Sequence, residues 1–338
     1  MRTGAVLDRR IHNGEIFHVV NRRCRDDVTV TERDDYNSGR PPFEAEYESG
    51  DHSSHSKMKQ LDTVAIIGVG LIGGSIGLTL RQRALARTVV GIGRTASRLR
   101  IAEEIGAVSW ATSDVRRGVA DADLIVVCTP VGLVVDHVRQ VRLTCRPSAL
   151  ITDAGSTKGN ICRSLETSAD GHGTFVGSHP MAGSEKSGPE FADPNLFEGC
   201  VTVVTPTASS PETRVAELEE FWRLLGARVL RMAPDEHDRA VAEISHLPHL
   251  LASALAACVD PRDLVLAATG WRDTTRVASG DVELWRQIFA ENRCHVLQSL
   301  AKFEKVLSAF RLALEGNDSA ELGRLLDVGK RNRDTLAS

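Results

Sequence analysis

The chain has 338 residues, of which 42% are hydrophobic and 25% are charged, and its formal net charge at pH 7 is −4. This length exceeds what one hydrophobic core usually supports, so we expect two domains. No run of about 18 apolar residues is present, which predicts no membrane span. The acidic net charge argues against a nucleic-acid or anionic-membrane binder, and an anionic small molecule would need locally placed cations.

The first 57 residues differ in composition from the rest. They contain 20 charged and only 16 apolar residues, and both tyrosines, Tyr36 and Tyr47. Such a segment buries too little apolar surface to offset the entropy of ordering. We expect residues 1–57 to be a polar, disordered extension and not a signal or transit peptide. A partner-binding tail, or a translation start at Met58, are the alternatives.

From residue 63 onward, apolar β-branched runs alternate with helical patterns. This alternation predicts parallel βαβ units, since parallel neighbours need a crossover. We expect an α/β dinucleotide-binding (Rossmann-type) domain over residues 58–233. The expected strands cover residues 63–67, 88–93, 123–130, 148–155, 173–181, 200–207 and 227–232, and the expected helices cover residues 71–84, 98–106, 131–145 and 211–227.

After Pro234 the strand pattern ends and helical patterns follow. We expect an all-α domain over residues 234–338, with helices at 246–259 and 263–269 and one long helical segment at 282–314. In that last segment apolar residues recur every three or four positions, at Val296, Leu300, Phe303, Leu307, Phe310 and Leu314. This stripe requires a partner helix. A core contact and a homodimer interface fit it equally well.

A glycine motif follows the first expected strand and begins a helix, and it consists of Gly68, Gly70 and Gly73 with Leu71 and Ile72 between them. The first glycine permits the tight turn, the second lets the backbone approach a pyrophosphate, and the third lets helix and strand pack closely. The helix N-terminus then presents free N–H groups to the phosphates. This context predicts an NAD or NADP site.

The end of the second strand bears on the choice of cofactor. The acidic residue that would bind the adenine ribose is absent there, and Arg94 lies within reach of the position of that ribose. This favours the 2′-phosphate of NADP, although Arg94 could instead stack on adenine in a site that takes NAD. Thr129, Pro130 and Val131 follow a later strand, where a nicotinamide ring would pass.

Four polar segments interrupt buried-looking elements: DAGSTKG at 153–159, GSHPMAG at 177–183 followed by Glu185, SHLPH at 245–249 and GWRDTTRVA at 270–278. The first two lie at the carboxyl ends of expected strands, where open α/β sheets bind ligands. These four segments, in this order behind the glycine motif, resemble the prephenate/arogenate dehydrogenase family of tyrosine biosynthesis. The resemblance covers roughly residues 60–335.

The resemblance implies an NAD(P)-dependent oxidative decarboxylation with small-molecule substrates. By match to the family, His179 is the catalytic histidine and Ser156 orients the histidine and the substrate. A neutral imidazole suits proton acceptance near pH 7. Arg276 matches the arginine that binds a carboxylate, Arg272 and His249 match positions near the side-chain carboxylate, and Trp285 matches a tryptophan near the site. Taken singly, Ser156 could cap a helix, and the arginines could pair with Asp273 or Asp281.

Several alternatives remain open. Prephenate dehydrogenase is the main hypothesis and arogenate dehydrogenase the runner-up. A β-hydroxyacid dehydrogenase is disfavoured because residues 233–300 contain no lysine, and a non-catalytic nucleotide sensor would not be expected to keep His179, Ser156 and Arg276. His246 and His249 lack a third metal ligand nearby, so we expect no metal. The seven cysteines are odd in number and never in a C-x-x-C pair, which favours free thiols and a cytoplasmic location.

Overall fold

The computed structural model describes residues 60–166, 172–184 and 186–336. The expected extension at 1–57, Met58 and the motif residue Glu185 lie outside these described residues. Residues 56–338 belong to one compact unit, and everything below concerns its described part.

The centre of this unit is a six-stranded parallel sheet with the strand order β3-β2-β1-β4-β5-β6. Its strands are β1 (Leu61–Ile67), β2 (Ala86–Ile92), β3 (Trp110–Thr112), β4 (Leu124–Val127), β5 (Leu150–Asp153) and β6 (Thr174–Phe175). All four residues of β4 are buried, which explains its continuous apolar sequence, because both faces of a parallel sheet are covered. The strand order reverses between β1 and β4, and such a switch point is where doubly wound sheets bind ligands.

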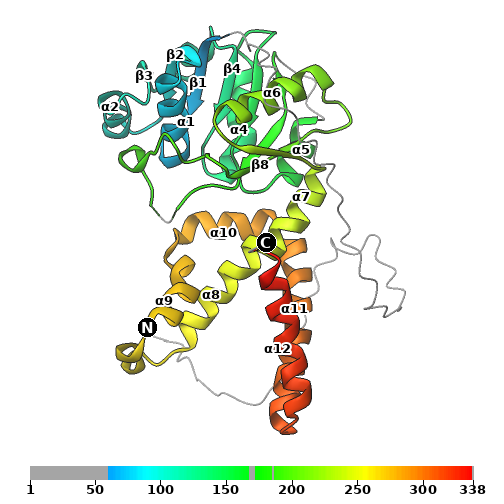
Figure 1. Cartoon of the computed structure of the whole chain (residues 1–338). Helices are drawn as coiled ribbons and strands as arrows, with labels where there is room; N and C mark the ends of the chain where they lie inside the picture. The colour runs from blue at the N-terminus through cyan, green and yellow to red at the C-terminus, as the bar shows by residue number, and fades with distance from the viewer. Residues whose placement is uncertain (1–59, 167–171, 185, 337–338) are drawn as a thin grey trace, which may run out of the picture. The chain divides into compact units, whose positions relative to one another are not determined.

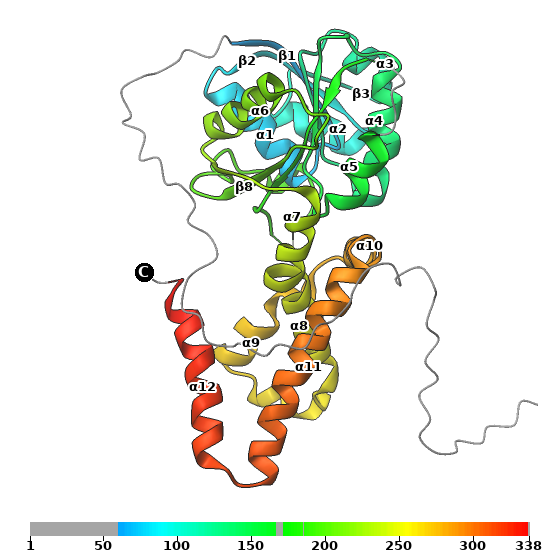
Figure 2. The ribbon, with the colours of Figure 1, turned by 90° about the vertical axis from the view of Figure 1, so that its right-hand side faces the viewer.

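Helices cover both faces of the sheet, as Figure 2 shows, with α1 and α6 on one face and α3, α4 and α5 on the other. The bounds are α1 (Leu71–Gln82), α2 (Ala96–Glu104), α3 (Val115–Val119), α4 (Val134–Arg142), α5 (Gly159–Glu166) and α6 (Glu212–Leu224). Two separate apolar clusters, one on each face, form the core. The prediction of a Rossmann-type α/β domain is therefore confirmed.

A second, three-stranded sheet carries the strand on which His179 lies. It consists of β7 (Gly177–Pro180), β8 (Val201–Thr205) and β9 (Arg228–Arg231), with β7 antiparallel to β8 and β8 parallel to β9. The run 173–181, expected as one strand, is thus divided between two sheets. Buried hydrogen bonds fix β7 against β5 and α6, because the Ser178 hydroxyl donates to the Asp153 carbonyl (2.7 Å) and the Trp222 indole N–H donates to the Ser178 hydroxyl (3.0 Å).

From Pro234 onward the chain is helical, as expected, and Figure 1 shows these helices in yellow to red. The α-helices are α7 (Pro234–Val241), α8 (Leu247–Cys258), α9 (Thr269–Thr275), α10 (Val282–Glu291), α11 (Arg293–Glu315) and α12 (Ser319–Asp334), and residues 263–269 lie partly in a 3-10 segment, Pro261–Leu266. The long segment 282–314 is not one helix, because it breaks at Asn292. Its second part, α11, packs side by side with α12 (Figures 1 and 2).

A π-helical turn, Ala242–His246, joins α7 to α8. Its last hydrogen bond runs from the Leu247 N–H to the Ala242 carbonyl, five residues back. A wide turn of this kind accommodates Pro248, whose ring would meet the carbonyl of the preceding turn of an ordinary α-helix. The SHLPH motif therefore lies at the π-helical turn, and Pro248 of the motif explains why the helix widens there.

The continuous helical stretch Pro234–Cys258 is long and apolar enough, by length and composition alone, to cross a membrane. This differs from the expectation that no segment would pass such a test. Three histidines on this stretch, His237, His246 and His249, are buried in the protein interior. Only 28% of the most apolar window of this stretch is buried, so the histidines mark one face that packs against the protein while most of the window is not buried.

Candidate active site

The glycine motif forms the tight connection between β1 and α1. Gly68 has a φ of +92°, and a Cβ there would lie 2.7 Å from the Cys128 carbonyl oxygen. A Cβ at Gly73 would lie 2.3 Å from the Gly68 carbonyl oxygen, so helix and strand approach closely only because this residue is glycine. Leu71 and Ile72 form the first turn of α1 with Gly73.

A cavity of about 240 Å³ opens beside this turn. Of the residues that we expected to bind the cofactor, five line it: Gly68, Gly70, Arg94, Thr129 and Pro130. Val131 is buried at the start of the 3-10 turn Val131–Leu133, next to the lining residues. The expected cofactor residues from β1, β2 and β4 thus lie around one cavity at the switch point of the sheet.

The residues of this cavity fit a dinucleotide. A Cβ at Gly70 would meet no atom within 4 Å, so the space that its absence leaves is open. Gly70 is also the N-cap of α1 and supplies no side-chain cap, and the first turn of α1 contains no acid. The N–H groups and the positive end of the helix dipole are therefore available to a pyrophosphate.

The far end of the cavity is basic. Arg94, Thr95 and Arg98 line it, and none of its described lining residues is acidic. The neighbouring His137 ring accepts or donates a hydrogen bond at the Thr129 hydroxyl, 3.0 Å away. Burial and the nearby Arg94 guanidinium lower the pKa of His137. Arg94 and His137 of α4 therefore lie near each other in the lining of this cavity.

A second and larger cavity, of about 580 Å³, lies at the end of β7. It is lined by residues from the β5–α5 connection, β7, α8, α10 and the segments between β7 and α10. These residues include Ser156, His179, Lys186, His246, His249, Arg276 and Trp285. The structure thus brings together four of the five residues expected for catalysis and substrate binding. The fifth, Arg272, is exposed on α9 and is not among the lining residues.

His179 has a polar partner that the sequence did not suggest. Its Nδ1 lies 2.9 Å from Nε2 of His237, and Nδ1 of His237 lies 2.8 Å from a carboxylate oxygen of Asp238. Burial, together with the neighbouring His237, Lys158 and His246, lowers the pKa of His179 well below its ordinary value. The His179 imidazole is therefore neutral near pH 7, as a proton acceptor must be.

Asp238 connects this histidine pair to the helix that follows β5. Its two carboxylate oxygens accept hydrogen bonds from the backbone N–H groups of Lys158 (2.7 Å) and Gly159 (2.8 Å), at the start of α5. Burial raises the pKa of Asp238, but the hydrogen bonds from His237 and these two N–H groups outweigh it and hold that pKa below its ordinary value. Asp238, rather than Ser156, thus caps α5.

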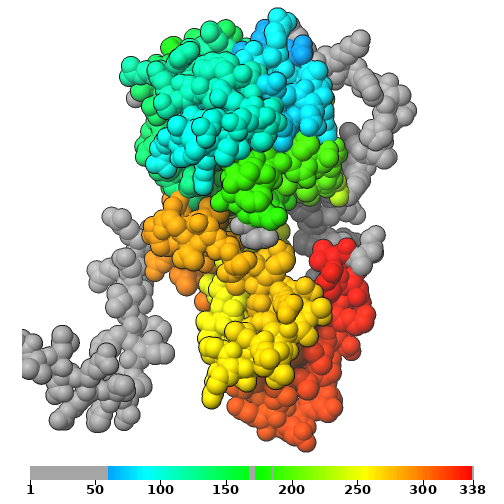
Figure 3. Space-filling view, turned by 90° about the vertical axis from the view of Figure 1, so that its left-hand side faces the viewer, coloured from blue at the N-terminus to red at the C-terminus, as the bar shows by residue number. Residues whose placement is uncertain are grey.

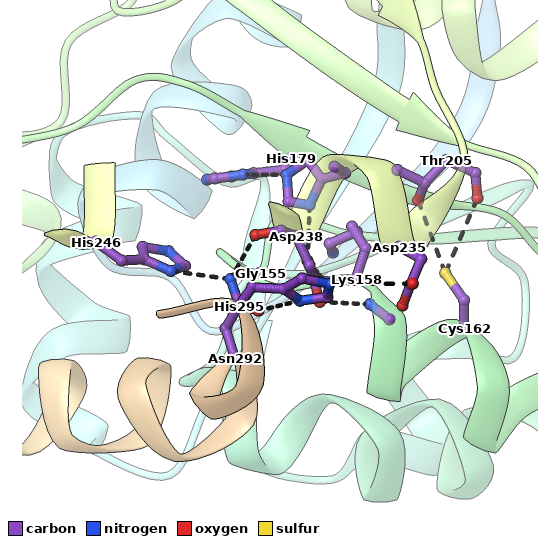
Figure 4. A network of polar contacts seen from close by, with 12 residues as sticks. Gly155, Lys158, Cys162, His179, Thr205, Asp235, Asp238, His246, Asn292 and His295 are labelled. Carbon is purple, nitrogen blue, oxygen red and sulfur yellow. Dashed lines mark hydrogen bonds and ion pairs between the residues drawn. The ribbon is translucent and has the colours of Figure 1, made fainter. Parts of the chain in front are cut away.

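A buried ion pair between Lys158 and Asp153 lies near His179 and Asp238. The Lys158 ammonium contacts the Asp153 carboxylate and donates to the Ser178 carbonyl (2.9 Å), and both side chains of the pair are completely buried. The pair ties the end of β5 to β7 one residue before His179. Figure 4 shows Lys158 and Asp238 close to His179.

His246 is oriented by Asn292, the residue at which the expected long helix breaks. The Asn292 amide donates to the Asp238 carbonyl (2.6 Å) and lies 3.1 Å from Nδ1 of His246, as Figure 4 shows for Asn292 and His246. Nδ1 of His246 therefore accepts, which leaves the N–H of the neutral ring on Nε2. Burial lowers the pKa of His246 to about 4, so this ring is a neutral donor.

His249 stacks on Trp285, with ring centroids 3.5 Å apart and an interplanar angle of 12°. Gly280 lies against both rings, since a Cβ there would come within 2.8 Å of the Trp285 indole nitrogen and 3.2 Å of the His249 ring. Burial lowers the pKa of His249. Trp285 thus fixes the face that His249 turns to the cavity.

Lys186 also lines the cavity, although it belongs to none of the four polar motifs. Its ammonium lies 5.3 Å from the centre of the Phe191 ring. Its proximity to the GSHPMAG motif was the only signal in the sequence. Across the described ranges, no group of three or more His, Cys, Asp or Glu side chains is arranged to hold a metal.

Comparisons with known proteins match both parts of the chain. Residues 76–231 match the family model described as prephenate dehydrogenase, nucleotide-binding domain, and residues 233–328 match the one described as prephenate dehydrogenase, dimerization domain. A curated prephenate dehydrogenase of Bacillus subtilis is 30% identical over 81% of this chain and 76% of its own length.

Two solved structures are similar to the described fold. The prephenate dehydrogenase of A. aeolicus, in complex with hydroxyphenyl propionate and NAD+, has a TM-score of 0.77 and 30% identity, over 83% of this chain and all of that chain. The Synechocystis arogenate dehydrogenase has a TM-score of 0.70 and 31% identity, over 81% of this chain and 99% of that chain. With the glycine turn, the His179 cavity and both family models in agreement, this chain belongs to the prephenate dehydrogenase family.

Proposed function

We propose that the protein is an NAD(P)-dependent prephenate dehydrogenase, which converts prephenate to 4-hydroxyphenylpyruvate and carbon dioxide. The observation that carries this proposal is that a neutral, buried His179 and the cationic Arg276 line one cavity at the end of β7. The reaction needs a proton acceptor at the ring hydroxyl and cations for two carboxylates, and this cavity offers both.

In the proposed mechanism His179 accepts the proton of the ring hydroxyl through Nε2, because its Nδ1 is engaged by His237. The carbon that bears the hydroxyl loses its hydrogen as a hydride and becomes a carbonyl carbon, and after decarboxylation the phenolate oxygen takes the proton back from His179 to give the phenol. The ring carboxylate leaves as carbon dioxide, and the electron pair of the broken C–C bond completes the aromatic ring. The nicotinamide of the bound cofactor supplies the hydride acceptor.

We assign the binding of the ring carboxylate to Arg276, whose planar guanidinium can hold a carboxylate with two parallel hydrogen bonds. His249 on its Trp285 support, the donor His246 and Lys186 surround the remaining space. Ser156 lines the same cavity as His179, and we assign it the role of orienting substrate and base. Arg272 is exposed on α9 and stays a prediction as a contact for the side-chain carboxylate.

The charges of the cavity favour prephenate over arogenate. Prephenate carries two carboxylates, whereas arogenate also carries an amine. Among the described lining residues the two cations are Lys186 and Arg276 and the one acid is Asp281. The Asp281 carboxylate already caps α10 by accepting from the Leu284 N–H (2.7 Å). A dianion is therefore better matched than a substrate with an ammonium group.

Steady-state kinetics test these assignments directly. Purified protein is mixed with NAD+ or NADP+ and with prephenate or arogenate, and nicotinamide reduction is followed. We expect turnover with a larger kcat/KM for prephenate. His179→Asn should lower kcat by roughly 10²–10⁴-fold, the usual contribution of a general base, and leave cofactor affinity unchanged. Absence of turnover with both substrates and both cofactors would refute the proposed function.

We further propose that residues 58–233 bind the nucleotide and that residues 234–338 form a helical substrate and dimerisation domain. The α7 helix begins at Pro234, next to the start of the second family-model match at residue 233. Six cysteines in the described part of the chain are free. Free thiols are typical of reducing compartments, and we propose that the protein acts in the cytoplasm.

The helical domain exposes apolar side chains that support a homodimer. In the stripe on α11, Leu307 is 55% and Leu314 is 64% exposed, and Val265 and Leu266 in the segment before α9 are also largely exposed. Figure 3 shows one face of the helical domain, which is coloured from yellow to red by residue number. A large exposed apolar surface marks an interface, and the match to a dimerization domain points to a second copy as its occupant.

Sedimentation tests the homodimer. We expect the unmodified chain to sediment as a dimer and the double variant Leu307→Glu/Leu314→Glu to sediment as a monomer. Leu143→Glu is the matched control, because Leu143 is a comparably exposed leucine (68%) in the nucleotide-binding part. A double variant that remains dimeric would place the interface elsewhere.

A further inference from the structure

The link from Asp238 through His237 to His179 has a direction that can be worked out from its donors and acceptors. An ionised carboxylate only accepts hydrogen bonds, and the hydrogen bonds at Asp238 hold its pKa below the ordinary value. The contact of 2.8 Å between Asp238 and Nδ1 of His237 therefore requires a hydrogen on that nitrogen. A neutral imidazole has one N–H, so Nε2 of His237 is then an acceptor.

The same logic continues to the next ring. Nε2 of His237 lies 2.9 Å from Nδ1 of His179. If His237 accepts there, Nδ1 of His179 must donate, and the single N–H of a neutral His179 is used in this contact. Nε2 of His179, the other ring nitrogen, is left with its lone pair, as a base that faces substrate requires.

We infer that His237 and Asp238 are positioning residues that hold His179 in the tautomer with its hydrogen on Nδ1, so that Nε2 accepts the substrate proton. This inference rests on the proposed function. The inference explains why Nε2 of the buried His179 presents a lone pair, and not an N–H, to the cavity. When His179 takes up the proton, the imidazolium that forms keeps its Nδ1–H hydrogen bond to His237, which in turn donates to the Asp238 carboxylate.

The surroundings of these residues make the arrangement specific. His237 is completely buried and Asp238 is 3% exposed, and the Asp238 carboxylate also caps α5. The other titratable groups near His179 are Lys158, which is held by Asp153, and His246, which is oriented by Asn292. Each of these has a hydrogen-bond partner of its own. In this set His237 alone is hydrogen-bonded to the His179 ring.

The decisive measurement is the tautomer of His179, read from the ¹⁵N chemical shifts of the ring nitrogens in histidine-labelled protein near pH 7. It needs neither cofactor nor turnover. We expect Nδ1 of His179 to carry the hydrogen in the full-length chain, and the spectrum of His179→Asn assigns the signals. A hydrogen on Nε2 of His179, or an imidazolium at His237, would overturn the inference even if the enzyme turns over prephenate.

Variants at His237 test the consequence for the reaction. His237→Phe removes the acceptor and keeps a ring of similar size, and we expect kcat to fall by more than tenfold but by less than the roughly 10²–10⁴-fold loss of His179→Asn. KM and cofactor affinity should change little. His237→Gln can still accept from His179 and donate to Asp238, and should recover part of kcat and the Nδ1–H tautomer.

A fold defect is separated from a positioning defect by controls. His172→Phe alters an exposed histidine that is not among the lining residues of the cavity, and should leave both kcat and the His179 signals unchanged. Circular dichroism and cofactor titration report whether His237→Phe is folded. A folded His237→Phe with unchanged kcat would contradict the inference, as would a loss that His237→Gln does not relieve at all. Failure of the proposed function would instead appear as no turnover in the full-length, unmodified chain.

Discussion

The imidazole of His249 lies parallel to the indole of Trp285, with the ring centroids 3.5 Å apart. His249 comes from α8 and Trp285 from α10, so the stack joins two helices at the cavity. Gly280, directly before the N-cap of α10, leaves the space that the indole occupies. A substrate that contacts His249 therefore meets a ring whose orientation is fixed before binding.

Removal of the indole should weaken substrate binding more than catalysis. Stacked aromatic pairs contribute about 0.5–1.5 kcal/mol beyond their buried area, so Trp285→Ala should raise the substrate KM by about two- to tenfold. Trp285→Phe, which keeps a ring, should have a smaller effect. Trp110→Phe in β3 is the control. A change confined to kcat in Trp285→Ala would show that the stack serves the chemical step instead.

Two glycines of the same motif should respond in different ways to alanine. At Gly70 a Cβ meets no atom within 4 Å, so Gly70→Ala should fold with an unchanged Tm and yet lose cofactor affinity, because the methyl group occupies the space of the pyrophosphate. At Gly73 a Cβ would lie 2.3 Å from the Gly68 carbonyl oxygen and 2.9 Å from Ile66. Gly73→Ala should therefore lose about 1–3 kcal/mol of stability, the usual cost of overpacking.

Thermal unfolding and calorimetric titration with NAD+ and NADP+ distinguish these two outcomes. A lower Tm in Gly70→Ala with an unchanged Tm in Gly73→Ala would contradict the assignment of Gly70 to cofactor binding and of Gly73 to helix–strand packing.

Local sequence was enough to predict the nucleotide-binding half and much of the site. Strand–helix alternation and the glycine motif depend on neighbours in the chain, and His179 and Arg276 were identified from short motifs. His237 was missed because its partner His179 is 58 residues away and the two meet only when α7 packs on β7. The break at Asn292 carries no glycine or proline, and contacts of its amide with Asp238 and His246 mark it only in three dimensions.

Arg94 should decide between the two cofactors. If its guanidinium pairs with the 2′-phosphate of NADP, a charge-assisted contact worth about 1.5–3 kcal/mol is lost in Arg94→Ala, and affinity for NADP+ should fall by roughly 10- to 150-fold while that for NAD+ stays unchanged. Titration with 2′,5′-ADP and with 5′-AMP measures the same difference without turnover. Arg87→Ala is the control, because Arg87 lies near the start of β2, is 74% exposed and pairs with Asp62.

Equal losses of affinity for NAD+ and NADP+ in Arg94→Ala would favour the other hypothesis, in which Arg94 stacks on adenine.

Arg276 should act mainly on substrate binding. A guanidinium that holds a carboxylate with two hydrogen bonds contributes about 1.5–3 kcal/mol, so Arg276→Ala should raise the substrate KM by roughly 10- to 150-fold and leave cofactor affinity unchanged. Arg276→Lys keeps the charge but not the planar fork, and should recover little of the loss. Arg272→Ala, on the exposed part of α9, offers the comparison. An equal KM effect at Arg272 would show that α9 reaches the substrate.

Stability should fall when the pH is lowered from 7 to 5. Burial lowers the pKa of His179 and His249 and that of His246 to about 4, with His237 and Lys158 acting in the same direction on His179. In the unfolded chain these rings have a pKa of about 6.5, so below that pH the unfolded state binds protons that the folded state does not. The free energy of unfolding therefore decreases as the pH falls through this window, and it is fully regained above about pH 7.5.

Urea unfolding at a series of pH values measures how steeply the free energy of unfolding depends on pH. This slope should be shallower in His246→Gln and unchanged in the exposed variant His172→Gln. A slope in His246→Gln as steep as in the unmodified chain would mean that His246 is protonated in the folded protein, and it would remove the neutral donor from the proposed site.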